Sequence, residues 1–145
     1  FPSQGSGTLF TTIKKGLSYH TLGTTAFIAI PDVINSMYRL MKSDCCNERF
    51  TLIAENLVFK DVFFTIADAL KVKRPTRYAS PLLTTIAWKI DALLAFLSIK
   101  KRTFSRVTAK ASHSAIPYSN QKIVSQLEPT FTNIKAYIQE IAPTF

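Results

Sequence analysis

The chain has 145 residues, of which 47% are hydrophobic and 19% charged, and this composition is typical of a globular protein and excludes an intrinsically disordered one. Eighteen lysines and arginines against nine acidic residues give a formal net charge of +9. The two cysteines are adjacent, at Cys45 and Cys46, so they supply neither a disulfide framework nor a zinc-binding pattern. We expect a cytoplasmic location with reduced thiols.

The stretch up to residue 30 predicts one short helix followed by a small hairpin. Four apolar residues recur at helical spacing and mark the helix, which is expected to end near Gly16: Leu9, Phe10, Ile13 and Leu17. Two apolar runs, Tyr19 to Leu22 and Phe27 to Ile30, flank the turn residues 23–25, and this pattern predicts a β-hairpin. His20 has no partner motif, so we interpret it as a structural or surface residue.

An amphipathic helix is predicted next, from Pro31 to about Met41. Proline fits the first turn of a helix, and Asp32 places a negative charge at the positive end of the helix dipole. Five apolar residues then recur at helical spacing and form one stripe: Val33, Ile34, Met37, Tyr38 and Met41. We expect this stripe, including the Tyr38 ring, to pack in the core.

A short strand and a third helix are predicted in the middle of the chain. The strand covers Phe50 to Ala54, and Asn56 is a candidate cap for the helix that follows. Five apolar residues of that helix fall on one face: Phe59, Val62, Phe63, Ile66 and Leu70. The pattern predicts a helix over residues 59–70.

Ser80 and Pro81 predict the start of a longer helix, because serine is a good N-cap and proline suits the first helical position. Its apolar residues continue to about Ser98. Lys89 and Asp91 would lie near the centre of a bilayer, where each costs roughly 2.5–3.5 kcal/mol, so we expect a buried or partner-facing helix and not a membrane span.

Three shorter helices complete the predicted fold. They begin after Ser105, after Ser119 or Asn120, and after Thr132, each of which can cap a helix. The sequence therefore predicts a single mixed α/β, helix-rich domain over residues 1–145, with about six helices and three or four short strands.

The sequence lacks the motifs of a self-sufficient enzyme. The four glycines, at positions 5, 7, 16 and 23, match neither G-x-G-x-x-G nor a P-loop. Two tyrosines have a lysine four residues on, Tyr38 with Lys42 and Tyr118 with Lys122, but we assign neither pair a catalytic role. We find no catalytic, cofactor-binding or metal-ligating set.

Four blocks in order resemble the C-terminal half of extended short-chain dehydrogenases/reductases, in the NAD-dependent epimerase/dehydratase and dihydroflavonol-reductase-like branch. The first is Phe27 to Ile34, with the pattern aromatic-x-x-[Val/Ile]-x-Asp-[Val/Leu]-[Ala/Val]. The others are Glu48 to Asn56, Phe59 to Leu70 followed by Lys73-Arg74-Pro75, and Tyr118 to Ile123 followed by Leu127. Together they cover nearly the whole chain.

The resemblance implies that this chain is the substrate-binding C-terminal cap of an NAD(P)-binding Rossmann-fold oxidoreductase or epimerase. The nucleotide-binding half, with the glycine motif, the catalytic Tyr-x-x-x-Lys and the NAD or NADP cofactor, would be absent here, so we expect the chain to be a fragment without activity of its own. The segments that line the substrate pocket in this family correspond to six candidate residues: Pro2, Ser3, Thr25, Phe27, Tyr78 and Ser80.

Thr25 and Ala29 depart from the nucleotide-sugar epimerases of this family. Those proteins often have an arginine at the position of Thr25, which holds the diphosphate, and a histidine at that of Ala29. The resemblance therefore favours a reductase acting on a small carbonyl or alcohol compound.

The net charge leaves an alternative open. A stand-alone basic helical module could bind nucleic acid or an acidic partner. The positive residues are scattered and no nucleic-acid-binding motif accompanies them, so we expect neither nucleic acid nor membrane as a partner. We expect instead a small-molecule substrate, the missing Rossmann half, and a homo-oligomer that associates through residues 82–97 or an unpaired strand edge.

Overall fold

The computed structural model describes residues 7–96 and 106–145, and in this part of the chain there are seven α-helices, a short 3-10 helix and four strands. In chain order they are α1 Gly7–Lys14, β1 Tyr19–His20, β2 Thr24–Phe27, α2 Ile30–Met41, β3 Glu55–Val58, α3 Phe59–Ala69, β4 Arg77–Tyr78, α4 Pro81–Phe96, α5 Arg106–Ala111, α6 Gln121–Leu127, α7 Ile134–Ile141 and η1 Ala142–Thr144. The mixed α/β, helix-rich class predicted from the sequence is confirmed.

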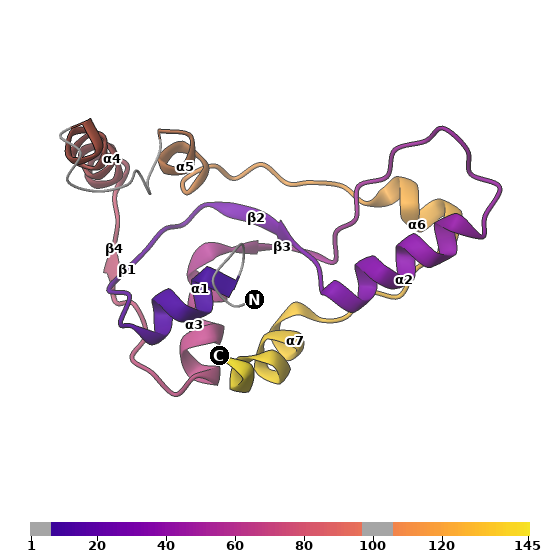
Figure 1. Ribbon diagram of the computed structural model, residues 1–145, viewed down its shortest axis with the longest axis horizontal. Coiled ribbons are helices and arrows are strands. Elements are labelled where there is room, and N and C mark those ends of the chain that lie inside the picture. The colour runs from indigo at the N-terminus through magenta and orange to yellow at the C-terminus, as the bar shows by residue number, and fades with distance from the viewer. Residues whose placement is uncertain (1–6, 97–105) are drawn as a thin grey trace.

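The core lies where α1, α3 and α7 meet below the strands (Figure 1). Its buried side chains come mainly from the apolar faces of these three helices and from η1: Phe10, Ile13, Val62, Ile66, Ala67, Ile134, Ile138 and Ala142. The predicted helix over 59–70 is confirmed as α3, and its apolar spacing explains why it forms the centre of this cluster.

The predicted hairpin between residues 19–22 and 27–30 is wrong. β1 pairs in parallel with β4, where Tyr19 lies opposite Arg77, and β2 pairs antiparallel with β3, where Thr24 lies opposite Val58. The expected turn residues 24 and 25 belong to β2 itself. Strand formers on both sides of a glycine resembled a local hairpin, but both strands pair with segments more than twenty residues away.

Two other boundaries differ from the prediction. The strand expected at residues 50–54 lies at Glu55–Val58, so Asn56 is part of it and does not cap α3. The cap of α7 is Asn133, whose side chain accepts a hydrogen bond from the backbone N–H of Ala136, and not its neighbour Thr132. A polar side chain beside an apolar run is typical of a helix cap. Here the Asn56 side chain bonds to Tyr118 and the Thr132 side chain bonds to Asp32, so neither caps a helix.

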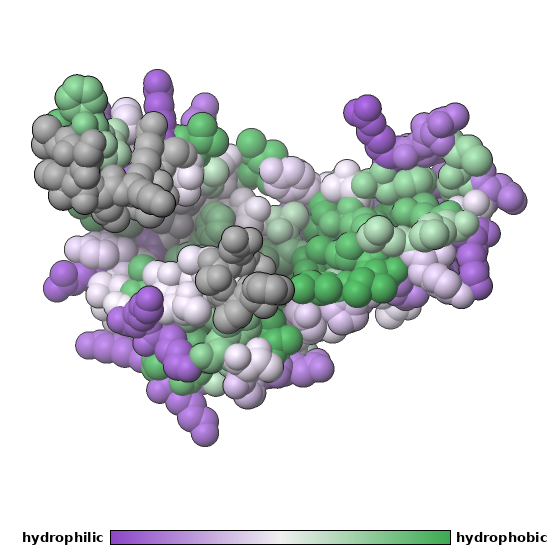
Figure 2. Space-filling model, in the orientation of Figure 1, coloured by the Kyte–Doolittle hydropathy of each residue, from purple (hydrophilic) through white to green (hydrophobic). Residues whose placement is uncertain are grey.

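Helix α2 is oriented opposite to the prediction. Its apolar residues face outward: Ile34 is 62% exposed, Met41 84%, and Tyr38 more than half. The polar Asp32 and Ser36 are buried instead, at 9% and 2% exposure. Figure 2 shows the resulting apolar surface over α2. The expectation that Tyr38 packs in the core is wrong; its ring lies under the Lys42 ammonium, 4.4 Å away.

Hydrogen bonds of polar side chains connect the polar side of α2 and strand β3 to the C-terminal segment. The Asp32 carboxylate accepts bonds from the N–H and the hydroxyl of Thr132, at 2.7 and 2.9 Å. The Glu55 carboxylate accepts the N–H of Ile134 at 2.9 Å, in the first turn of α7, where negative charge also suits the helix dipole. The Asn56 amide makes two bonds to the backbone of Tyr118, at 2.9 and 3.0 Å.

Helices α4 and α5 form one end of the molecule, and α2 and α6 form the other (Figure 1). Helix α4 begins as predicted, with the Ser80 hydroxyl accepting the N–H of Leu83 at 3.3 Å. The positions expected beyond Phe96, up to Ser98, and the cap residue Ser105 lie outside the described residues. Within residues 7–96 and 106–145, no helix is both long enough and apolar enough to cross a membrane.

Candidate functional site

Two open pockets flank helix α5. The first lies between α4 and α5 and has a volume of about 700 Å³; we name it the α4–α5 pocket. The second lies between α5, the start of β2 and the start of α3 and has a volume of about 450 Å³; we name it the β2–α5 pocket. Arg106, Lys110 and Ser114 line both, so the two pockets adjoin across α5. Both volumes are in the range of small-molecule sites.

Gly23 positions α5 beside the sheet. Its N–H donates to the carbonyl of Ser112 at 3.0 Å, and the next N–H, of Thr24, donates to the carbonyl of Ser114 at 2.8 Å. A Cβ on residue 23 would lie 2.4 Å from the Ser112 oxygen, so only glycine permits this approach. The turn glycine of the predicted hairpin therefore permits a close contact between two backbone segments, and its neighbours Thr24 and Ser114 line the β2–α5 pocket.

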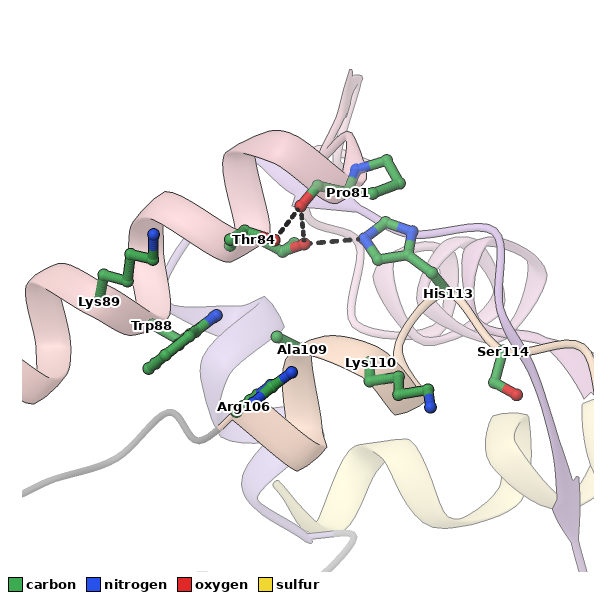
Figure 3. A pocket seen from close by; sticks show the side chains of 10 residues that line it. Pro81, Thr84, Trp88, Lys89, Arg106, Ala109, Lys110, His113 and Ser114 are labelled. Carbon is green, nitrogen blue, oxygen red and sulfur yellow. Dashed lines mark hydrogen bonds between the residues drawn. The ribbon is translucent and has the colours of Figure 1, made fainter.

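The α4–α5 pocket is fixed at one end by a hydrogen bond between α4 and the turn that follows α5. The Thr84 hydroxyl lies 3.0 Å from the Pro81 carbonyl, 3.3 Å from the Ser80 carbonyl and 3.0 Å from Nε2 of His113 (Figure 3). The hydroxyl can donate one hydrogen bond and accept others, so it can bond to a carbonyl and to the imidazole at the same time. His113 is thereby held in one orientation.

Positive side chains dominate both pockets. Lys89 from α4 and Arg106 and Lys110 from α5 line the α4–α5 pocket, and none of its lining residues in the described part of the chain is acidic. Figure 3 shows Trp88 on α4 and Arg106 on α5 at one end of this pocket, with Lys110 farther along α5. The site therefore offers cations beside an aromatic ring.

The six predicted pocket residues do not meet in one place. Thr25 lines the β2–α5 pocket. Tyr78 and Ser80 lie at the end of the α4–α5 pocket, since the Tyr78 ring contacts that of His113 at 6.3 Å between centroids and the Ser80 carbonyl lies beside Thr84. Phe27 is elsewhere: it packs on the core and lines a small apolar cavity of about 70 Å³. Pro2 and Ser3 lie outside the described residues.

Sequence reasoning did not single out the residues that line the α4–α5 pocket most prominently. Arg106 and Lys110 are four residues apart, a spacing that places both on one face of a helix. Trp88 lies off the main apolar stripe of α4. The spacing of Arg106 and Lys110 and the position of Trp88 can be read from the sequence, but neither indicates that α4 and α5 face each other.

The remaining titratable groups singled out from the sequence have structural contacts. His20 is buried, with Nδ1 3.0 Å from the Pro75 carbonyl. Lys122 is ion-paired with Glu48 at 2.7 Å, and Cys45 contacts Gln126. Within residues 7–96 and 106–145, no cluster of three His, Cys, Asp or Glu side chains could hold a metal ion.

Comparisons with known proteins give a likeness in fold. No protein-family model matches the chain, and no curated protein matches it in sequence. The chain is similar to a solved structure described as "Crystal structure of gox2253", with a TM-score of 0.67 and 14% identity over 91% of this chain. At that identity the similarity concerns the fold alone. The match covers 40% of the other protein, so this chain spans less than half the length of that relative.

Proposed function

We propose that this chain is the substrate-binding C-terminal part of an NAD(P)-dependent oxidoreductase of the extended short-chain dehydrogenase/reductase type. The cofactor and the catalytic tyrosine and lysine would belong to a Rossmann half that precedes it. The substrate would be a small carbonyl or alcohol compound. The chain alone would catalyse nothing, and the whole protein would act in the cytoplasm.

The observation that carries the proposal is the outward apolar face of α2. A stripe of Ile34, Met37, Tyr38 and Met41 in water is unfavourable, because each exposed apolar side chain gives up the free energy of burial, roughly 25 cal/mol per Å². Contiguous apolar surface of this kind is typical of contact sites. A Rossmann half packed on α2 would cover it, since its own sheet needs an apolar layer on each face.

Contacts between two of the resembling blocks also support the proposal. Asn56 in the second block binds Tyr118 in the fourth, and Asn120, also in the fourth block, donates to the Ile53 carbonyl at 2.7 Å. Asp32 in the first block binds Thr132, which lies outside the four blocks. Residues of the second and fourth blocks therefore hold one another in place, as expected of a pattern that belongs to one structural unit.

The β2–α5 pocket favours a reductase over a nucleotide-sugar epimerase. Thr25 lines it and offers a hydroxyl where those epimerases often place arginine. The pocket also has an aromatic and aliphatic side, with Phe59, Val107 and Ile116. These side chains would contact an apolar part of a carbonyl compound, while Arg106 and Lys110 also line the pocket.

Sequencing the complete transcript that encodes this chain tests the proposal. The expected result is an upstream reading frame with a glycine-rich strand–turn–helix and a Tyr-x-x-x-Lys, and a full-length product that oxidises NADH or NADPH with small aldehydes or ketones. A complete transcript whose product lacks both motifs would overturn the proposal.

A further inference from the structure

We propose that the α4–α5 pocket binds a planar aromatic compound that carries an oxyanion, with the ring beside Trp88 and the anionic group between Arg106 and Lys110. As a statement about substrate class, this inference rests on the function proposed above. As a statement about binding, it stands on the pocket alone and can be tested without any enzymatic activity.

The charge of the pocket defines the anionic end of the ligand. Lys89, Arg106 and Lys110 bring three positive charges to one opening, and its described lining contains no carboxylate to neutralise them. Positive charges that line one opening create a field that favours an anion there. Arg106 in particular can make two parallel hydrogen bonds to a carboxylate or phosphate.

Trp88 defines the flat end of the ligand. Its indole ring is half-buried, lines the pocket, and stands near Arg106 at the same end (Figure 3). An indole face is a good surface for another ring, because offset stacking adds to the burial of apolar area. A ligand that has only a ring or only an anionic group would use half of this site.

The fixed end of the pocket limits the length of the ligand. The bond between Thr84 and His113 joins α4 to the end of α5 and holds the imidazole as a wall. The volume of about 700 Å³ is that of a small-molecule site. A nucleic acid would instead need a continuous basic surface along its backbone.

The chain contains a single tryptophan, which makes the test specific to this pocket. In a ¹⁵N-labelled sample of the whole chain, the one indole N–H resonance comes from Trp88. We would titrate it with 2-naphthoate, which has ring and anion, with 2-naphthalenemethanol, which has only the ring, and with inorganic phosphate, which has only the anion. 2-Naphthyl phosphate distinguishes a phosphate from a carboxylate as the preferred anionic group.

The expected result is a saturable shift of the indole signal by 2-naphthoate or 2-naphthyl phosphate, at lower concentration than with either partial probe. Arg106→Gln and Lys110→Gln should each weaken this binding about tenfold, the effect of losing a charged hydrogen bond. Lys135→Gln, which removes an exposed cation on α7, is the matched control and should leave the affinity unchanged.

Three results would overturn the inference: no saturable shift with either anionic ring compound, equal affinity for 2-naphthalenemethanol, or an equal loss in Lys135→Gln. A stronger shift with mixed-sequence DNA, weakened alike by all three substitutions, would also overturn it and favour a nucleic-acid-binding protein. These outcomes are independent of the transcript test. If the indole signal does not shift but the transcript encodes an upstream Rossmann half, the proposed ligand is wrong and the proposed function stands.

Discussion

Helices α3 and α2 have similar sequence patterns and opposite orientations in the fold. Both carry apolar residues at helical spacing, and in both the spacing correctly predicted a helix. In α3 the stripe is buried, with Val62 and Ile66 in the core. In α2 the stripe is exposed, and the buried residues are Asp32 and Ser36. An amphipathic pattern therefore identifies a face that needs a partner, but it does not say whether that partner lies within the same chain.

Helix α4 belongs with α2 in this comparison. Its buried residues are Thr84 and Asp91, while its large apolar side chains are exposed: Leu82, Leu83, Ile86, Ile90, Leu93 and Phe96. The two helices lie at opposite ends of the molecule (Figure 1), and both have exposed apolar side chains. The described part of the chain thus buries a core between α1, α3 and α7 and exposes two further apolar faces.

The largest expected effect is the difference in lost stability between a substitution on the buried face of α3 and one on the exposed face of α2. Ile66→Ala removes a buried side chain from α3 and should lower the free energy of unfolding by about 2–5 kcal/mol. Ile34→Ala makes the same change on the exposed face of α2, where surface substitutions usually stay within about 0.5 kcal/mol. Urea denaturation of both variants measures the difference. Equal losses would mean that the α2 stripe is covered within this chain.

A second expected effect concerns the polar side of α2. Asp32→Ala removes the acceptor of two hydrogen bonds from Thr132 and should lower the free energy of unfolding by about 1.5–3 kcal/mol. Asp44→Ala, at an exposed position in the turn after α2, is the control and should change little. The two urea midpoints would coincide if the Asp32 contacts contributed nothing.

The sequence predicted the helices, which depend on neighbouring residues, and it did not predict the strand pairing, which depends on distant ones. Ser80 and Pro81 start α4 because capping is local, and the spacing of Phe59 to Leu70 is enough to define α3. The partners of β1 and β2 are not local, so the predicted hairpin was wrong.

The candidate site shows the same limit. Thr25 lines the β2–α5 pocket, Tyr78 and Ser80 lie beside residues of the α4–α5 pocket, and Phe27 packs on the core. The placement of α5 depends on a backbone approach at Gly23 that no residue pattern reveals. The contact between α4 and the end of α5 depends in turn on the bond between Thr84 and His113, so Arg106 and Trp88 could not be connected from the sequence.

The smallest expected effect lies on the surface next to α3. Arg74 donates two hydrogen bonds to Asp68, at 2.6 and 2.7 Å, and these bonds and its charge hold the pKa of the Asp68 carboxyl below its usual range. Because the pKa is lowered in the folded state, the pair stabilises the fold at pH values above the usual pKa range of aspartate. That contribution is lost as the pH falls through the lowered pKa. Screening by solvent keeps this contribution to the stability of the fold small.

An NMR titration of the Asp68 carboxyl measures this shift. In Arg74→Gln the pKa should return toward the usual range, whereas in the neighbouring control Lys73→Gln it should stay low. An unchanged pKa in Arg74→Gln would show that the ion pair does not form in solution.

Sedimentation equilibrium of the purified chain at low micromolar concentration tests most directly whether the faces of α2 and α4 are contact surfaces. In the absence of a covering half, apolar faces promote association. We expect a mass above 16.2 kDa that rises with concentration. We also expect a monomer when the responsible face is made polar, by Ile34→Lys with Met37→Lys on α2 or by Ile86→Lys with Leu93→Lys on α4. A wild-type chain that stays at 16.2 kDa at every concentration would show that neither face is a contact surface.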